Sequence, residues 1–274
     1  MNRALWKKAI AAAWLQLLIS SLLLILFAWL FVWLMGLFKL GAWASFLQML
    51  PDFTHRAMGV PVKHIATPQG QITILYEHVI TILIFIGWAI GRGSDPISGE
   101  ISRGTMDLTL TLPVRRTSVI FVPAVVSTVG AIVLGASVWL GTWIGLVVAR
   151  RGEGIDAAEF LPGAVNLVAM TFCLLGLTTF VSSWNRSRWR TISICMGIFV
   201  ISVIIKMVGR LWEPGEWLKY FSFLTPFDPQ KLILLPNGAW DMSLRFDSIL
   251  VGLGLLSYVL AALVFARRDI PSAL

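Results

Sequence analysis

The charged stretch from Gly99 to Arg116, GEISRGTMDLTLTLPVRR, is the part of the sequence whose side chains could do chemistry at a water-exposed surface. Glu100 and Arg103 are three residues apart, which is the spacing of an ion pair on one face of a helix, and Asp107 follows one turn later. These residue types can form polar contacts, but they do not include a nucleophile next to a general base. Taken alone, the spacing favours an ion pair that solvates an ordinary loop.

The rest of the sequence offers few residues that could catalyse a reaction or bind a metal. Glu77 and His78 are the one close acid and base pair inside the apolar segments, and neither H-E-x-x-H nor G-x-S-x-G occurs. His55 and His64 lack the spacing of metal ligands. The sequence also lacks G-x-x-x-x-G-K-[ST], the loop that holds the phosphates of ATP. We therefore predict no catalytic residue, no metal site and no cofactor-binding site in this chain, and an intramembrane enzyme is the least favoured function.

The composition indicates the environment in which these side chains are held. The chain has 274 residues, of which 57% are hydrophobic and 13% are charged. This is far from the usage of soluble globular proteins and indicates an integral membrane protein. The net charge of +8 comes from short basic clusters beside apolar runs. Such clusters face anionic lipid headgroups, so we expect membrane lipids and not nucleic acid as partners.

Six apolar segments are long enough to cross a bilayer, for which a helix needs about 20 residues. We therefore predict an all-α membrane protein whose 274 residues form a single transmembrane domain. The predicted spans cover residues 15–38, 72–91, 117–149, 161–185, 191–209 and 248–266. The segment 92–116, between the second and third spans, is the predicted coupling segment.

The density of Lys and Arg predicts the orientation. Basic residues are denser in the loops that share a side with both chain ends, and the positive-inside rule places that side in the cytoplasm. Near the N-terminus, Trp6, Ile10, Ala13 and Leu17 share one helical face. They predict a short interfacial helix that lies on the inner leaflet. The alternative is that these residues begin one long first helix.

Glu77 and Lys206 are ionisable residues that fall inside two predicted spans. At 1.5 Å per residue, Glu77 lies about 22 Å from Arg92 and Lys206 about 24 Å from Arg190 along their helices. Both should therefore lie near the outer boundary of the hydrocarbon, where they could form an intramembrane charge pair. The alternative is that each side chain extends separately to the outer interface.

Helix caps predict the structure of the charged stretch. Asp95 and Pro96 are a good N-cap and first helical residue, and Gly104 suits a left-handed C-cap. Thr105 can cap a second short helix, and Pro113 ends it. We therefore expect a compact helical turn at the cytoplasmic face.

The same stretch resembles the cytoplasmic segment of ABC-2 type transporter permeases. That segment has Glu, a two-residue gap, Arg or Lys, Gly-Thr-Leu, a leucine-rich turn and Pro-Val-x-Arg. The positions that match are Glu100, Arg103, Gly104, Thr105, Leu108, Pro113, Val114 and Arg116, whereas Met106 replaces the usual leucine. The six spans and the place of the segment between the second and third also agree with this family. About twenty residues carry the specific resemblance.

The resemblance implies a permease subunit of an ATP-driven transporter, with export as the expected direction. It implies that the segment from Asp95 to Arg116 is a coupling helix that docks on a separate ATPase. The coupling residues would be Glu100, Arg103, Gly104, Thr105, Asp107, Pro113 and Arg116. Two copies of the ATPase, which carry ATP and Mg²⁺, and a second permease subunit, expected to form a homodimer, would complete the complex. The chain would lie in the inner or plasma membrane of a prokaryote. A channel-like or structural membrane subunit is the alternative function.

Overall fold

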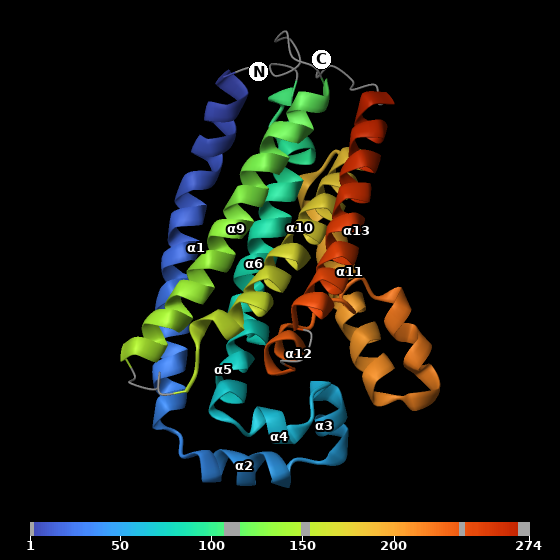
Figure 1. Cartoon of the computed structure of the whole chain (residues 1–274). Helices are drawn as coiled ribbons and strands as arrows, with labels where there is room; N and C mark the ends of the chain where they lie inside the picture. The colour runs from blue at the N-terminus through green and yellow to red at the C-terminus, as the bar shows by residue number, and fades with distance from the viewer. Residues whose placement is uncertain (1–2, 107–115, 149–153, 236–238, 268–274) are drawn as a thin grey trace.

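The computed structural model is a bundle of long helices that run side by side (Figure 1). It describes residues 3–106, 116–148, 154–235 and 239–267. Within these residues there is no strand, and six helical segments are long and apolar enough to cross a membrane. Five of the spans are α1 (Arg3–Leu37), α9 (Arg116–Val148), α10 (Leu161–Trp184), α11 (Arg188–Leu211) and α13 (Ala239–Arg267). The remaining span begins with α5 (Pro68–Glu77) and α6 (Val79–Ser94). The prediction of an all-α protein with six spans is confirmed.

The first and last helices have their outer ends at the same end of the bundle, where α1 begins and α13 finishes (Figure 1). We call this the N-terminal end. The opposite end carries short elements. They are α2 (Leu40–Met49), α3 (Asp52–Met58), α4 (Val62–Ile65), the 3₁₀ turns η2 (Ala157–Phe160) and η3 (Glu213–Phe221), and α12 (Pro229–Leu234).

The N-terminal residues do not form a separate interfacial helix. α1 is continuous over 35 residues, and no proline interrupts it. Leu5 and Ala9 are buried against Val122 of α9, so the first turns pack along the same neighbour as the rest of the helix. The alternative prediction, that these residues begin one long first helix, describes the structure.

The second span is broken in the half that lies toward the opposite end. α5 stops at Glu77, and His78 has extended backbone angles of φ −65° and ψ 141° before α6 begins. The His78 Nδ1 atom accepts a hydrogen bond of 3.2 Å from the backbone N–H of Ile80, so this side chain caps the new helix. The predicted span 72–91 is thus two helices.

α10 is the central helix of the bundle and the most buried of the spans. It packs against α6, α9 and α13. Its approach to α13 depends on small residues, because a Cβ atom at Gly176 would collide with the carbonyl oxygen of Gly254. Close backbone contact of this kind is how membrane helices gain packing energy without a difference in hydrophobicity. A fixed central helix gives the surrounding spans a common support.

Candidate functional site

The candidate site is formed where the second span reaches the N-terminal end of the bundle. After Ser94, α6 continues without a break as a π-helical turn, η1 (Asp95–Gly99), and then as α7 (Glu100–Ser102). Pro96 has no N–H to donate to the preceding turn, and the Glu100 N–H bonds to the Asp95 carbonyl oxygen, five residues back. The predicted helix start at Asp95 is therefore wrong, because the helix of the span carries on through it.

The predicted helix end at Gly104 is confirmed. Gly104 has a φ of 68°, in the left-handed region that favours glycine. The Thr105 N–H donates to the Glu100 carbonyl oxygen at 3.0 Å, and the Gly104 N–H donates to that of Ile101 at 3.1 Å. These two bonds make a Schellman cap, which satisfies the last carbonyls of the helix and turns the chain away from it.

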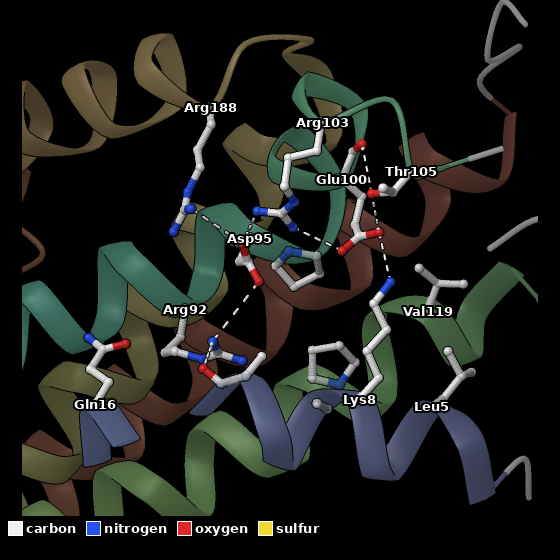
Figure 2. Close-up of a pocket in the computed structure, with 14 residues that line it drawn as sticks. Leu5, Lys8, Gln16, Arg92, Asp95, Glu100, Arg103, Thr105, Val119 and Arg188 are labelled. Atoms are coloured by element: carbon white, nitrogen blue, oxygen red, sulfur yellow. Dashed lines mark hydrogen bonds and ion pairs between the residues drawn. The ribbon is translucent and has the colours of Figure 1, made fainter. Parts of the chain in front are cut away.

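Glu100 lies inside the site and faces its own chain. Only 7% of the residue is exposed. Its carboxylate accepts hydrogen bonds from Lys8 Nζ at 2.8 Å, Arg103 Nη2 at 2.9 Å and Thr105 Oγ1 at 2.7 Å (Figure 2). Glu100 thus connects the end of the second span to α1. The predicted Glu100–Arg103 ion pair is present, but its carboxylate contacts α1 and does not face outward.

Asp95 is the second acidic centre of the site. Its carboxylate lies 2.9 Å from Arg103, 3.4 Å from Arg188 and 4.0 Å from Arg92 (Figure 2). Partial burial lowers the pKa of the Arg103 guanidinium, but its hydrogen bonds with Asp95 and Glu100 outweigh this and raise the pKa above its ordinary value. Arg103 therefore stays charged and bridges the two carboxylates. We refer to Lys8, Arg92, Asp95, Glu100, Arg103 and Arg188 as the coupling cluster.

Buried hydroxyl groups hold the same segment against α10 and α11. The Ser98 N–H donates to Ser182 Oγ of α10 at 2.9 Å, and Thr191 Oγ1 of α11 donates to Ser98 Oγ at 3.0 Å. Ser102 Oγ accepts from the Arg188 N–H at 2.9 Å. Ser98, Ser182 and Thr191 are buried, so the hydrogen bonds of their hydroxyl groups are shielded from competing water.

The tip of the segment is exposed beside the connection between α10 and α11. Arg103 and Gly104 are exposed, and the Ser102 hydroxyl donates to the Arg186 carbonyl oxygen at 3.1 Å. Trp189, at the start of α11, is 78% exposed. The two connections therefore form one continuous polar and aromatic surface at the N-terminal end.

The structure brings together four of the seven predicted coupling residues, Glu100, Arg103, Gly104 and Thr105. Asp107 and Pro113 lie outside the described residues, and Arg116 is the first residue of α9.

Four residues of the coupling cluster are absent from the predicted set of coupling residues. The sequence indicates a helix cap at Asp95, and Lys8, Arg92 and Arg188 contribute to the density of basic residues that predicts the orientation. Their distance along the chain hides the contact, since Lys8 is 92 residues from Glu100. The feature of the sequence that could have identified them is that each is a charged residue next to an apolar segment.

The second predicted feature, Glu77 with Lys206, lies near the opposite end. Lys206 Nζ donates to the Phe227 carbonyl oxygen and lies 5.5 Å from the centre of the Phe227 ring. Arg210 Nη2 pairs with Asp228 Oδ2 at 2.6 Å. Among the described residues no direct Glu77–Lys206 ion pair is formed, although both are electrostatic neighbours of Arg210 and Asp228. The charges form a group of four, which we call the opposite-end quartet.

Comparison with known proteins identifies the family of the chain. The sequence matches the family described as ABC-2 family transporter protein over residues 9–270. No curated protein matches it at a significant level. The family match covers part of α1 and the whole of the other five spans, and it includes the opposite-end quartet and every residue of the coupling cluster except Lys8. The chain belongs to the ABC-2 family of transporter proteins, and its six-helix bundle is the membrane permease of an ABC transporter.

Proposed function

We propose that this chain is the permease subunit of an ATP-driven exporter and that residues 95–116 couple it to a separate ATPase subunit. The observation that carries the proposal is the way in which the end of the second span is held. Glu100 attaches it to α1, Ser98 attaches it to α10, and Asp95 attaches it to α11. One short segment at the end of the bundle thus contacts three other spans.

Such a segment can transmit a displacement with little loss. A hydrogen bond to a charged group contributes about 1.5 to 3 kcal/mol, although the exposure of Lys8 reduces the value for its bond to Glu100. The buried bonds of Ser98 add directional contacts that would have to break before the segment moved alone. When the ATPase subunits close on ATP, they would therefore move the segment together with the spans attached to it. No chemistry in this chain is required.

The surface for the ATPase consists of the exposed tip and the start of α11. Arg103 provides a charge, Gly104 brings the backbone close to the partner, and Trp189 provides apolar area. Exposed Trp and Arg side chains are the residue types that most often carry the binding energy of protein interfaces. Glu100 acts as a positioning residue behind this surface.

The proposal takes the remaining parts of the complex from what the resemblance to ABC-2 permeases implies. Two copies of the ATPase would carry ATP and Mg²⁺, and two permease subunits, as a homodimer, would enclose one pathway. Export, a prokaryotic inner or plasma membrane and cytoplasmic termini belong to the same proposal. The density of basic residues at the N-terminal end supports this orientation.

Substitution of Trp189 tests the docking surface. The tagged chain, purified in mild detergent from its native membrane, should retain a protein with a nucleotide-binding P-loop. Trp189→Ala should weaken binding of the ATPase about 30-fold, because a central aromatic contact at an interface contributes about 2 kcal/mol. Tyr220→Ala is the matched control, since Tyr220 is 79% exposed but lies in η3 at the opposite end.

Two results would contradict the proposal. The first is a purified complex that contains no P-loop protein at all. The second is an equal amount of retained ATPase in the Trp189 and Tyr220 variants. If the chain alone conducted ions in liposomes, the channel-like alternative would replace the proposal.

A further inference from the structure

A cavity of about 510 Å³ lies behind the coupling cluster, between α1, η1, α9 and the start of α11 (Figure 2). Its size is within the range of about 300 to 1,000 Å³ that is usual for small-molecule sites. The two sides of the cavity differ. Polar side chains come from the second span, from α11 and from Lys8 and Gln16 of α1. The apolar side is formed by Leu5 and Ala9 of α1 and by Val119 and Pro123 of α9.

The polar side of the cavity carries more basic than acidic groups. Among the described residues that line it, Lys8, Arg92, Arg103 and Arg188 are basic, and only Asp95 and Glu100 are acidic. The single charge of the Asp95 carboxylate is shared by three guanidinium groups. The surplus of positive charge favours an anion in the cavity.

Arg92 gives the clearest indication of a missing partner. It is only 6% exposed, and its Nε atom is buried without a hydrogen-bond partner. Its Nη1 atom donates to the Ala12 carbonyl oxygen at 3.1 Å and lies 4.0 Å from Asp95. A buried donor without a partner is unfavourable, and the planar guanidinium group matches two oxygens of a phosphate. Figure 2 shows the side chains of Arg92 and Arg188 reaching the Asp95 carboxylate from two directions.

We propose that this cavity binds a phosphate ester, with the phosphate held between Arg92 and Arg188 and with Lys8 near it. Two sources have this chemistry, the headgroup of an anionic phospholipid and a free phosphate. The lipid fits the apolar wall of Leu5, Ala9 and Val119, along which the glycerol and the first carbons of a chain can lie. The outward face of α1 is apolar and exposed next to the cavity, as at Ile10 and Trp14, so lipid can reach it along the helix.

A bound phosphate would also strengthen the coupling cluster. The four basic groups outnumber the two carboxylates of Asp95 and Glu100, and the phosphate would supply the missing negative charge. The end of the second span, α1 and α11 would then contact one ligand. The site itself does not depend on the ATPase and is present in the permease alone, so its test and that of the proposed function can fail separately.

The test uses the full purified chain with two probes. In detergent with phosphatidylcholine as background, phosphatidylglycerol or inorganic phosphate is added, and retained lipid is measured by native mass spectrometry and the Tm by thermal unfolding. We expect phosphatidylglycerol to be retained and to raise the Tm. Arg188→Gln should weaken its binding about 10-fold, as expected for the loss of one charged hydrogen bond. Arg190→Gln, an exposed change on the same helix outside the cavity, should leave binding unchanged.

The outcomes distinguish the two sources and can overturn the site. Stabilisation by phosphatidylglycerol alone supports the site with lipid as its ligand, whereas equal stabilisation by millimolar inorganic phosphate supports it with free phosphate. The proposal is wrong if neither probe binds. It is also wrong if the Arg188 and Arg190 variants both bind the probe as well as the wild-type chain does.

Discussion

At the scale of single residues, a substitution of Glu100 tests how the segment is held in place, separately from the surface that it presents to a partner. It is buried and holds Lys8 and Arg103, so its replacement changes how the segment is held more than what the surface presents. Glu100→Gln should lower the free energy of unfolding by about 1 kcal/mol, because one partner is exposed. The rate of ATP hydrolysis in the assembled complex should fall, while membrane insertion stays normal.

The chain provides a matched control for Glu100. Arg56 and Glu213 form a 2.9 Å ion pair at the opposite end, and both side chains are more than half exposed. Glu213→Gln should leave both stability and ATP hydrolysis unchanged, as is usual for exposed pairs. A Glu100 variant that behaves like the Glu213 variant would show that the buried contact does not position the segment.

The opposite-end quartet gives a second prediction for single residues. Arg210→Met and Asp228→Asn break the same 2.6 Å contact, so the double variant should be more stable than the sum of the single losses implies. Glu77→Gln and Lys206→Met should couple less strongly, because these two side chains are not in direct contact. Thermal unfolding of the four single and two double variants measures both coupling energies. A larger coupling energy for Glu77 with Lys206 than for Arg210 with Asp228 would support the predicted Glu77–Lys206 pair.

At the scale of elements, the end of α7 depends on the left-handed conformation of Gly104. Gly104→Ala should cost about 1 kcal/mol, since a Cβ atom is unfavourable at a φ of 68°. Open space surrounds Gly104, so strain and not collision is the cause. The measurement is the free energy of unfolding of the purified chain, together with binding of the ATPase.

Gly197 in α11 is the control for this change. It is helical and also has open space around it. Gly197→Ala should be neutral or slightly stabilising, as alanine is the better helix former. An equal effect of the two substitutions would argue against a strained cap at Gly104.

The sequence predicts these elements well where apolar length or a cap decides the structure. The six spans follow from runs of apolar residues, and the helix end at Gly104 follows from its φ preference. The π-helical turn at Asp95 was not predictable in this way, because a good N-cap and proline pair also fits inside a continuing helix. The same holds for α1, where an amphipathic face at Trp6 does not distinguish a separate helix from the start of a long one.

The contacts of the candidate site were harder to predict than its location. The match from Glu100 to Thr105 identified the segment, but the direction of Glu100 depends on Lys8, which is distant in the sequence. Arg188 is equally distant, and its role depends on how α11 packs. Local patterns therefore locate a site, whereas the partners of its charges require the packed bundle.

At the scale of the whole molecule, α10 and α13 pack closely against each other in the bundle. Gly176→Leu should lower the free energy of unfolding by at least about 3 kcal/mol, because the collision is with backbone atoms of α13 that cannot rotate away. Gly252→Leu is the control, since nothing lies near Gly252. Thermal unfolding in detergent compares them, and equal Tm values would contradict the close approach of the two helices.

The orientation of the bundle is also a property of the whole molecule. In a background without Cys173 and Cys195, single cysteines at Tyr220 and Trp189 lie at opposite ends of the bundle and are largely exposed. An impermeant thiol reagent added to intact cells should label the cysteine at Tyr220. It should label the cysteine at Trp189 only after the membrane is opened. The reverse pattern would invert the orientation.

The break at His78 divides the second span into two helices that can move by different amounts. From Val79 to Ser102 the helix is continuous and about 36 Å long at 1.5 Å per residue, and it ends at the exposed tip. If this rod pivots at His78, a push of about 3 Å on the tip corresponds to a rotation of only about 5°. The displacement is largest at the N-terminal end and falls to zero at the pivot. α5 lies beyond that pivot, so a lever of this shape would move the part of the second span near the N-terminal end while α5 stays in place.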